Sequence, residues 1–503
     1  MKQKRWKTDG YLRIFASYYR PHWKLFALDM VCALCICLVD LAFPIVSRFS
    51  MQTLLPGQMF TAFFVVMAVL AGAYVLKGCF YYIITYWGHL LGVRMEADIR
   101  RDLFSHMQDL SFSFYDKNRT GQLMSRVTGD LFEITELAHH GPEDLFISSI
   151  TILGAFCVML TIRWELALIV FAVIPLFILF TTLCRKRMMR ASTEVKAKLA
   201  GINGEVESSI SGMRTAKAFA NEAAESAKFD QANDQFRGAK RGYYRAMAFY
   251  QSGMEFFMGI LSVVVIAFGG FLLMRGRMDL IDLTTFFLYI STFITPIRKL
   301  SAFVEQFMQG MAGFKRFVAL MRVEPDIQDE PDAQELTDVK GDIRVEDVTF
   351  RYEPSDPPVL EHVTLHVRPG ETVAVVGPSG GGKSTLCQLI PRFYDVTGGR
   401  VLVDGKDVRT LTQHSLRANI GIVQQDVFLF VGTIYDNIRY GRPDATEAEI
   451  VEAAKRAEIY DDILDMPDGF QTQVGERGAM LSGGQKQRVS IARIFLKNPP
   501  VLI

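Results

Sequence analysis

Six stretches of the sequence are long and apolar enough to cross the hydrocarbon core of a membrane, which takes about 20 residues of helix. A segment in lipid must satisfy its own backbone hydrogen bonds, so we expect each stretch to be an α-helix. The first is long and is followed by further spans, unlike a cleaved signal peptide. The sequence therefore predicts an all-α membrane domain over residues 1–322. The six spans lie near residues 25–47, 59–84, 143–162, 164–184, 253–274 and 280–299.

Basic residues ahead of the first span indicate its orientation. Residues 1–24 carry seven lysines and arginines and one acid, Asp9, and basic flanking segments stay on the cytoplasmic side. Six spans then return the chain to that side. Leu12, Phe15 and Tyr19 recur at helical spacing, which favours a short helix at the membrane interface; a solvated lead-in is the alternative.

The connections on the predicted inner side are long, whereas those on the outer side are short. The inner segments 92–142 and 185–252 are polar, and the first carries an apolar stripe at helical spacing. The stripe consists of Met95, Ile99, Leu103, Met107 and Leu110. No proline occurs between Pro175 and Pro296, so helix can leave the membrane, turn near residues 201–212 and return.

Two acids and several cysteines lie within the first predicted span. Asp29 is near the inner interface, where we expect it to be solvated, whereas Asp40 is deep in an apolar run. An unpaired carboxylate there is costly, so Asp40 should face a cavity or a partner. It either has a role in the transport path or makes a structural hydrogen bond to a neighbouring helix. Cys32 and Cys35 form a C-x-x-C without a strand-turn-helix pattern around it, so we interpret these cysteines as small hydrophobic residues.

A change of composition marks the end of the membrane part. Residues 323–340 are acidic, contain Pro325 and Pro331 and lack an apolar period, which is typical of a linker. From Gly341 onward, short β-type runs alternate with helical signal. The runs are IRVEDVTF, VTLHV, TVAVVG, VLVDG and IGIVQQ. This pattern predicts an α/β domain over residues 341–503.

The motif with the clearest chemistry follows the run TVAVVG. Residues 377–384 match the phosphate-loop pattern G-x-x-x-x-G-K-[ST] between a predicted strand and a predicted helix. Its glycines let backbone N–H groups surround phosphate oxygens, Lys383 reaches the outer phosphates, and the Ser384 hydroxyl binds Mg²⁺. We therefore expect a nucleoside triphosphate with Mg²⁺ here. The candidate residues are Gly377, Pro378, Ser379, Gly380, Gly381, Gly382, Lys383, Ser384 and Thr385.

A second glycine-rich motif, LSGGQ, consists of Leu481, Ser482, Gly483, Gly484 and Gln485. Ser482 can cap the helix that follows, and the two glycines leave N–H groups uncovered for an anion. With the phosphate loop upstream, this pentapeptide resembles the signature motif of the ATP-binding cassette (ABC) family. The resemblance covers nearly the whole chain. It implies a six-helix exporter domain with long cytoplasmic helix extensions, followed by an α/β P-loop NTPase domain that is incomplete at its C-terminus.

In that family, the signature motif of one chain binds the γ-phosphate of ATP held by the partner's phosphate loop. The resemblance therefore implies a dimer that encloses two nucleotides, a homodimer in preference to a heterodimer. It also implies that Tyr352 stacks on adenine and that Gln425 contacts Mg²⁺ and the attacking water. From the residues alone, a core aromatic remains the alternative for Tyr352. Gln424 competes with Gln425, because neighbouring strand residues point to opposite faces.

A six-span domain ahead of a cassette is similar to bacterial exporters that include multidrug pumps and the lipid A flippase. The resemblance implies a half-transporter of the plasma (inner) membrane, with its N-terminus and cassette cytoplasmic, that exports or flips a small hydrophobic or amphipathic drug or lipid. Two segments resemble the coupling regions of such exporters, FYDKNRTGQLMSRV and ISGMRTAKAFANE. A third, TQVGERG with Glu476, resembles the exporter segment that touches the inner helical turns. The net charge of +1 gives no attraction to nucleic acid.

The family pattern continues after the signature helix with an Asp that holds Mg²⁺, a Glu that polarises water (the Walker B pair) and a later His. The printed sequence stops at Ile503, before that pair. We therefore expect a fragment of a longer exporter, a naturally short protein being the alternative. No residue is assignable to these catalytic roles, so Lys383 and Gln425 only support catalysis. We expect a transport ATPase as the full-length protein, and slow or no ATP hydrolysis by these 503 residues.

Two other function classes use the same motifs. A nucleotide-gated channel and a regulatory ATP-binding membrane subunit both bind ATP through a phosphate loop without pumping a substrate. Flux against a gradient distinguishes an exporter from a channel, because a channel only dissipates a gradient. The residues fix neither the transported substrate nor the identity of the partner half.

Overall fold

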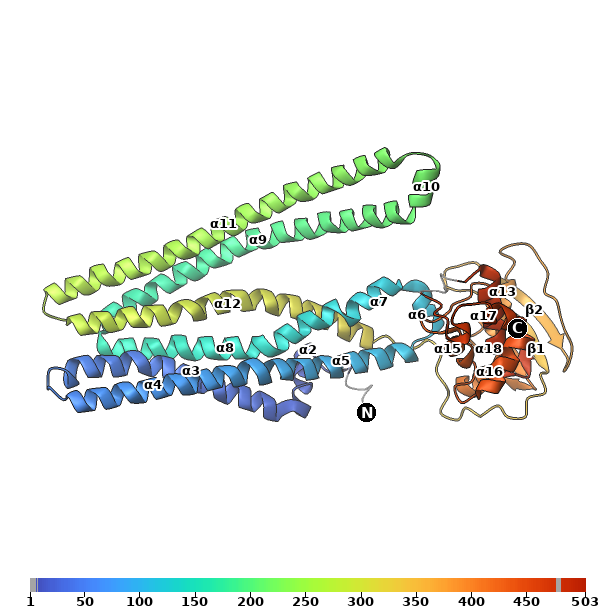
Figure 1. Ribbon diagram of the computed structural model, residues 1–503, viewed down its shortest axis with the longest axis horizontal. Helices are drawn as coiled ribbons and strands as arrows, with labels where there is room; N and C mark the ends of the chain where they lie inside the picture. The colour runs from blue at the N-terminus through green and yellow to red at the C-terminus, as the bar shows by residue number, and fades with distance from the viewer. Residues whose placement is uncertain (1–5, 7, 476–480) are drawn as a thin grey trace. The chain divides into compact units, whose positions relative to one another are not determined.

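The structure, a computed structural model, describes residue 6, residues 8–475 and residues 481–503 (Figure 1). The chain divides into two compact units. The first comprises Met1–His106 and Leu123–Arg322, and the second comprises Met107–Gln122 and Val323–Ile503. The division after Arg322 falls at the predicted domain boundary. Residues 107–122 were expected in the membrane domain but group with the second unit.

Among the described residues, six helices are long and apolar enough to cross a membrane. Five of them contain a predicted span in full, and α4 ends one residue short of the predicted span 59–84 on each side. They are α3 (Trp23–Phe49), α4 (Phe60–Ile83), α8 (Gly129–Ile162), α9 (Trp164–Ser211), α11 (Glu222–Met274) and α12 (Leu280–Met321). The last four are far longer than the roughly 20 residues that a span needs. The chain is therefore a multi-pass membrane protein whose helices extend beyond the lipid.

Shorter elements precede or connect these helices, and α5, with 21 residues, is the longest of them. They are α2 (Tyr11–Ser17), the turns η1 (Arg20–His22), η2 (Ser50–Leu54) and η3 (Ile84–Gly88), α5 (His89–Asp109), α7 (Thr120–Val127) and α10 (Met213–Ala218). The predicted stripe on α5 is buried, since Met95, Ile99 and Leu103 are at most 1% exposed. Helix α2 packs on α12 through Phe15, whose ring lies 5.1 Å from that of Phe314.

Helices α9 and α11 run side by side and are joined through α10 (Figure 1). The close approach depends on Gly253 of α11, because a Cβ there would lie 1.9 Å from the Phe180 ring of α9. Small residues serve this purpose between membrane helices. The turn lies at residues 212–221, beyond most of the predicted range 201–212, because no proline follows Pro175 in α9 and the helix continues through Gly201 to Ser211.

One of the two acids of α3, Asp29, lies in a different environment from the one that the sequence predicts. Asp29 is 1% exposed, so the prediction that it is solvated is wrong; the chain around Gly88 and His139 covers it. Asp40 forms an ion pair with Lys77 of α4. Of the two interpretations for Asp40, the contact to a neighbouring helix is the one that the structure contains.

The second unit has an antiparallel sheet in the order β2-β1-β3-β4. The strands are β1 (Ile343–Phe350), β2 (Leu360–Val367), β3 (Gly398–Val403) and β4 (Lys406–Asp407). In β1, residues Ile343 and Val345 alternate inward with polar residues outward, so one face packs into the core. A separate parallel pair joins β5 (Ile420–Gly421) to β6 (Val501–Leu502).

Helices cover this sheet and extend the unit. They are α6 (Phe112–Lys117), α13 (Lys383–Leu389), α14 (Gln413–Ala418), α15 (Ile434–Arg439), α16 (Glu447–Arg456), α17 (Tyr460–Leu464) and α18 (Gly483–Lys497), with the 3₁₀ turns η4 (Val408–Thr410) and η5 (Gly469–Gln471). The helices α15, α16 and α18 form a second core of their own around Ile450 and Val489. The unit is therefore an α/β lobe with a helical lobe inserted between β5 and β6.

Two predictions for this unit need correction. The run TVAVVG, residues 372–377, has no ladder partner and is not a strand, and Val373 and Val375 are 39% and 43% exposed. No described strand lies beside it to accept its backbone hydrogen bonds. The predicted linker, residues 323–340, is packed against the second unit and is not a free connection. Ile327 and Leu336 are buried, and Leu336 N–H donates a hydrogen bond to the Ser415 hydroxyl at 3.0 Å.

Candidate functional site

The phosphate loop has the backbone that its glycines predict. Gly380 and Gly382 both have φ of +79°, a left-handed conformation that favours glycine. At Gly382 a Cβ would also lie 2.6 Å from the Leu360 side chain. The sequence therefore turns the chain sharply into α13, and Ser384 at the start of that helix is exposed. An exposed hydroxyl at this point is free to act as a ligand to Mg²⁺.

Lys383 already lies across the loop. Its Nζ donates hydrogen bonds to the carbonyl oxygens of Gly377 and Pro378, at 3.0 and 2.7 Å. These neutral acceptors compensate the ammonium less well than a phosphate would, because charge-assisted bonds between two ionised groups are stronger. The loop is therefore arranged to exchange carbonyl oxygens for phosphate oxygens.

Tyr352 lies next to the phosphate loop. Its hydroxyl is 2.9 Å from the Thr385 hydroxyl of α13, and the residue is 45% exposed. The ring also makes an edge contact with Tyr394, with centroids 5.3 Å apart. Because nearly half of Tyr352 is open to solvent beside the loop, a core role does not account for it, and its ring can stack on a base.

The two glutamines lie differently from the strand expectation. The segment at residues 422–425 is outside β5, and both Gln424 and Gln425 are exposed. Gln424 lines a cavity of about 790 Å³ together with Lys383 and Ser384. Gln425 is not among the residues that line it. Gln424 therefore shares a cavity wall with Lys383 and Ser384, and the role of Gln425 stays a prediction.

That cavity is largely apolar. Its wall includes Val373, Val375, Ile422 and Val501, which are unsuited to a triphosphate. It lies where the run at residues 372–376 has no strand neighbour. We interpret it as a gap in the packing of the sheet, and assign the triphosphate to the N–H groups of the loop.

The signature motif forms the start of α18 as its residue types predict. The Ser482 hydroxyl accepts a hydrogen bond from Gln485 N–H at 3.2 Å, and the Gln485 side chain accepts one from Ser482 N–H at 3.0 Å. This reciprocal capping box fixes the helix end. Leu481 is buried beneath it, whereas Gly483 and Gly484 are exposed, and a Cβ added at either would meet nothing within 4 Å. An anion can therefore reach the helix N-terminus.

The phosphate loop and the signature motif belong to different cores. Leu386 and Leu389 of α13 pack with the β-sheet, whereas Leu481 and Val489 of the signature helix pack in the helical lobe. Gln485 and Arg488 are further tied to Asp462 of α17, at 3.2 and 2.8 Å. Each motif is thus built into a separate lobe.

The first predicted coupling region contacts the cassette within the second unit. Within it, Asp116 accepts a hydrogen bond from the Tyr394 hydroxyl. Two residues before this region, the Phe112 ring of α6 stacks on Phe393 with centroids 4.1 Å apart. Burial raises the pKa of Tyr394, and the bond to Asp116 raises it further, so the phenol stays a donor. Lys117 pairs with Glu353 at 2.5 Å.

Sequence reasoning missed several of these contacts. Phe393 and Tyr394 follow the phosphate-loop helix in the sequence PRFYD, and adjacent aromatics after a short helix were the available signal for a docking surface. Lys77, the partner of Asp40, was a lone cation inside an apolar run. Glu476 lies outside the described residues.

Comparison with known proteins decides the family. A family model described as the ABC transporter transmembrane region matches residues 26–297, and one described as ABC transporter matches residues 360–503. The chain belongs to the ABC transporter family. Together the two matches cover both units of this transporter, in the order membrane domain and then cassette.

Individual relatives of this ABC transporter extend over most of its length. It is 45% identical over 492 residues to "Uncharacterized ABC transporter ATP-binding protein YwjA" of Bacillus subtilis, across 98% of this chain and 85% of that one. It is 35% identical over 487 residues to the ATP-dependent lipid A-core flippase of Syntrophus aciditrophicus, across 96% and 80%. A bacterial Atm1-family ABC exporter with ATP bound matches with a TM-score of 0.82 at 26% identity, across 95% and 84%. The architecture is that of an exporter half-transporter.

Proposed function

We propose that this ABC transporter uses ATP to export or flip a hydrophobic or amphipathic molecule across the plasma membrane, as one half of a dimer. The observation that carries the proposal is the placement of two complementary ATP motifs on separate lobes of one cassette. A homodimer would join the phosphate loop of one chain to the signature motif of the other.

The loop residues have distinct roles in this proposal. Lys383 leaves the carbonyl oxygens of Gly377 and Pro378 and binds the outer phosphates. Tyr352 supports the adenine, and the capped end of α18 in the partner binds the γ-phosphate. Mg²⁺ would be held by Ser384 and a glutamine, and it supplies neutralisation of the phosphate charge. We assign this glutamine to Gln425, and Gln424, which lines a cavity with Ser384, is the alternative.

Transmission of ATP binding is assigned to the coupling regions. The α6 contacts described above provide a firm attachment between a membrane-domain loop and the cassette. The second region, around α10, has exposed apolar side chains, with Ile210 at 67% and Phe219 at 73% exposure. An apolar tip of this kind suits the surface of a partner cassette.

Two observations support the substrate class. The relative from Syntrophus aciditrophicus acts on lipid A-core, an amphipathic lipid. The membrane helices here offer many exposed apolar side chains and few charges, which suits a lipid or an amphipathic drug.

The N-terminus and the cassette are assigned to the cytoplasm because of the basic residues before the first span. Loss of hydrolysis in the 503-residue polypeptide stays a prediction.

Transport by the full-length protein tests this proposal. In proteoliposomes with outward-facing cassettes, we expect Mg-ATP to drive accumulation of a fluorescent phospholipid or an amphipathic dye against its gradient. The Lys383→Ala variant should abolish accumulation, and Lys406→Ala, on an exposed lysine of β4, should not. Flux that only dissipates a gradient when ATP binds would favour the nucleotide-gated channel, and no flux of either kind would favour a regulatory subunit.

A further inference from the structure

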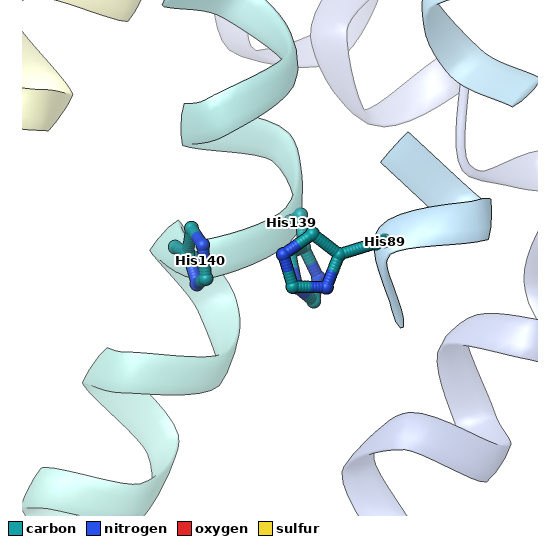
Figure 2. Close-up of side chains that lie close together, drawn as sticks. All are labelled: His89, His139 and His140. Carbon is teal, nitrogen blue, oxygen red and sulfur yellow. The ribbon is translucent and has the colours of Figure 1, made fainter. Parts of the chain in front are cut away.

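Three histidines gather at the junction between the second and third spans. His89 begins α5, directly after the π-helical turn η3, and His139 and His140 lie on α8. Figure 2 shows the three rings close together, His89 coming from one segment and the other two from the facing helix. All three belong to the first unit. The ABC motifs assign nothing to these residues.

The spacing of their nitrogens suits a shared ion. One ring nitrogen from each histidine lies within 4.8 Å of the others. The ring of His139 is 4.4 Å from each of the other two, between centroids. Zinc–nitrogen bonds of about 2.0–2.1 Å in a tetrahedral site place nitrogens roughly 3.4 Å apart. Small rotations of the exposed His89 and the half-buried His140 therefore close the site.

The hydrogen bond that His89 makes leaves the lone pair of its Nε2 available to a metal ion. Its Nδ1–H donates to the Thr85 carbonyl oxygen at 2.6 Å, so the lone pair of the neutral ring is on Nε2. A histidine that binds a metal usually donates its other N–H to a carbonyl or a carboxylate, which fixes the tautomer and orients the ring. This bond prepares His89 to act as a ligand.

Beneath the histidines, buried polar groups have unmet bonding capacity. Asp29, His139 and Glu143 are all at most 6% exposed and have ligand atoms within 4.8 Å of one another. Within the described part of the chain, Asp29 Oδ1 and His139 Nδ1 have no hydrogen-bond partner. A buried polar atom without a hydrogen-bond partner is unfavourable. A cation held by His139 would compensate both groups.

The backbone makes room for this cluster at Gly88. A Cβ there would lie 2.4 Å from Cε1 of His139 and 2.9 Å from Oδ1 of Asp29. Gly88 also closes the π-helical turn η3, and single π turns occur often at functional sites. Only glycine at this position admits both side chains.

We propose that His89, His139 and His140 form a binding site for a divalent transition-metal ion of the Zn²⁺ class. Asp29 and Glu143 lie behind His139, with Glu143 Oε2 at 3.9 Å from its Nε2, and support it. Glu136 Oε2 lies 3.9 Å from His140 Nε2 on the same helix, where it can orient that ring. Three imidazoles suit Zn²⁺, whereas Mg²⁺ and Ca²⁺ require oxygen ligands. The ion joins η3 and α5 to α8, and so ties two adjacent spans together.

Zinc titration of the full-length protein tests the site. The protein is purified through a tag without histidine, stripped with a chelator and titrated with Zn²⁺ against a chromogenic competitor. We expect one tight ion per chain, and at least a tenfold weaker affinity for His89→Gln, with excess Mg²⁺ giving no competition. His89 is exposed, so this variant should fold normally. Zn²⁺ should raise the thermal midpoint of the wild type more than that of His89→Gln.

A matched control is His106→Gln, on the same helix α5 but hydrogen-bonded to the Leu320 carbonyl oxygen at 3.1 Å. It should keep the wild-type affinity. Co²⁺ bound to the wild type should give the visible absorption of a tetrahedral site, which His139→Gln should lose. Equal Zn²⁺ affinity in the wild type and His89→Gln, or an equal loss in His106→Gln, would mean adventitious binding and would overturn the proposal.

Discussion

Lys383 is the residue on which nucleotide binding should depend most directly. Its ammonium carries two hydrogen bonds that a phosphate can replace. Removing it in Lys383→Ala should cost about 1.5–3 kcal/mol, the usual value for bonds to charged groups. Isothermal titration of ATP should therefore show roughly 10- to 100-fold weaker binding, and Lys406→Ala should bind as the wild type does. Unchanged affinity in Lys383→Ala would contradict the loop assignment.

The pair Asp40–Lys77 offers a second residue-scale prediction. Removing either partner leaves a charge in an apolar region, so Asp40→Asn and Lys77→Met should each lower stability by about 1–3 kcal/mol. The double variant should recover part of that loss, because no charge is left unpaired. Thermal unfolding in detergent measures this. If Asp40→Asn keeps normal stability and ATP turnover but alters transport, Asp40 belongs to the transport path instead.

At the scale of residues, the sequence predicted which side chains carry the chemistry better than it predicted what surrounds each of them. The loop and signature residues were identifiable because each is required by its motif. The burial of Asp29 was not, since it depends on His139, more than one hundred residues away, and on the space left by Gly88. The histidine cluster has the same origin, because no local pattern brings His89 to His139.

At the scale of elements, α6 should transmit the state of the cassette to the membrane helices. In Phe112→Ala the stack on Phe393 is lost, so we expect ATP turnover of the full-length protein to persist while transport falls severalfold. The matched control is Phe104→Ala, an exposed phenylalanine of α5. Equal loss of transport in both variants, or none in Phe112→Ala, would remove α6 from this role.

The signature helix gives a prediction with two separable effects. Ser482→Ala removes the cap on α18 and should destabilise the cassette by about 0.5–2 kcal/mol. Ser482→Asp keeps a capping oxygen but adds negative charge where the γ-phosphate binds, so it should keep stability and lose ATP-dependent dimerisation. Denaturant unfolding and light scattering measure the two effects. Dimerisation of Ser482→Asp at the wild-type ATP concentration would count against γ-phosphate binding here.

Long helices were the most predictable elements, because apolar length acts locally and because four of them continue through an internal proline, at Pro44, Pro142, Pro175 and Pro296. The strands were less so. IRVEDVTF became β1 because two neighbours accept its hydrogen bonds, whereas TVAVVG has strand-forming residues without a partner strand. A strand is a property of a pair, and a single segment cannot specify it.

At the scale of the whole molecule, the proposed transport depends on ATP being held between two chains. The phosphate loop and the signature motif lie on different lobes of each cassette, so one chain offers two half-sites. The family, the six helices and the cassette were predictable from motifs and hydropathy. Dimerisation of two copies was implied only by the family resemblance, because no residue pattern within a single chain specifies a partner.

Cysteine crosslinking measures directly whether the phosphate loop of one chain meets the signature motif of another. In the full-length protein with its native cysteines replaced, Ser379→Cys and Ser482→Cys are introduced on separate chains and mixed before mild oxidation. We predict that Mg-ATP raises the yield of the crosslinked dimer severalfold, and that Lys383→Ala abolishes the increase. A crosslinking yield that is the same with and without nucleotide would contradict the sharing of ATP between two chains.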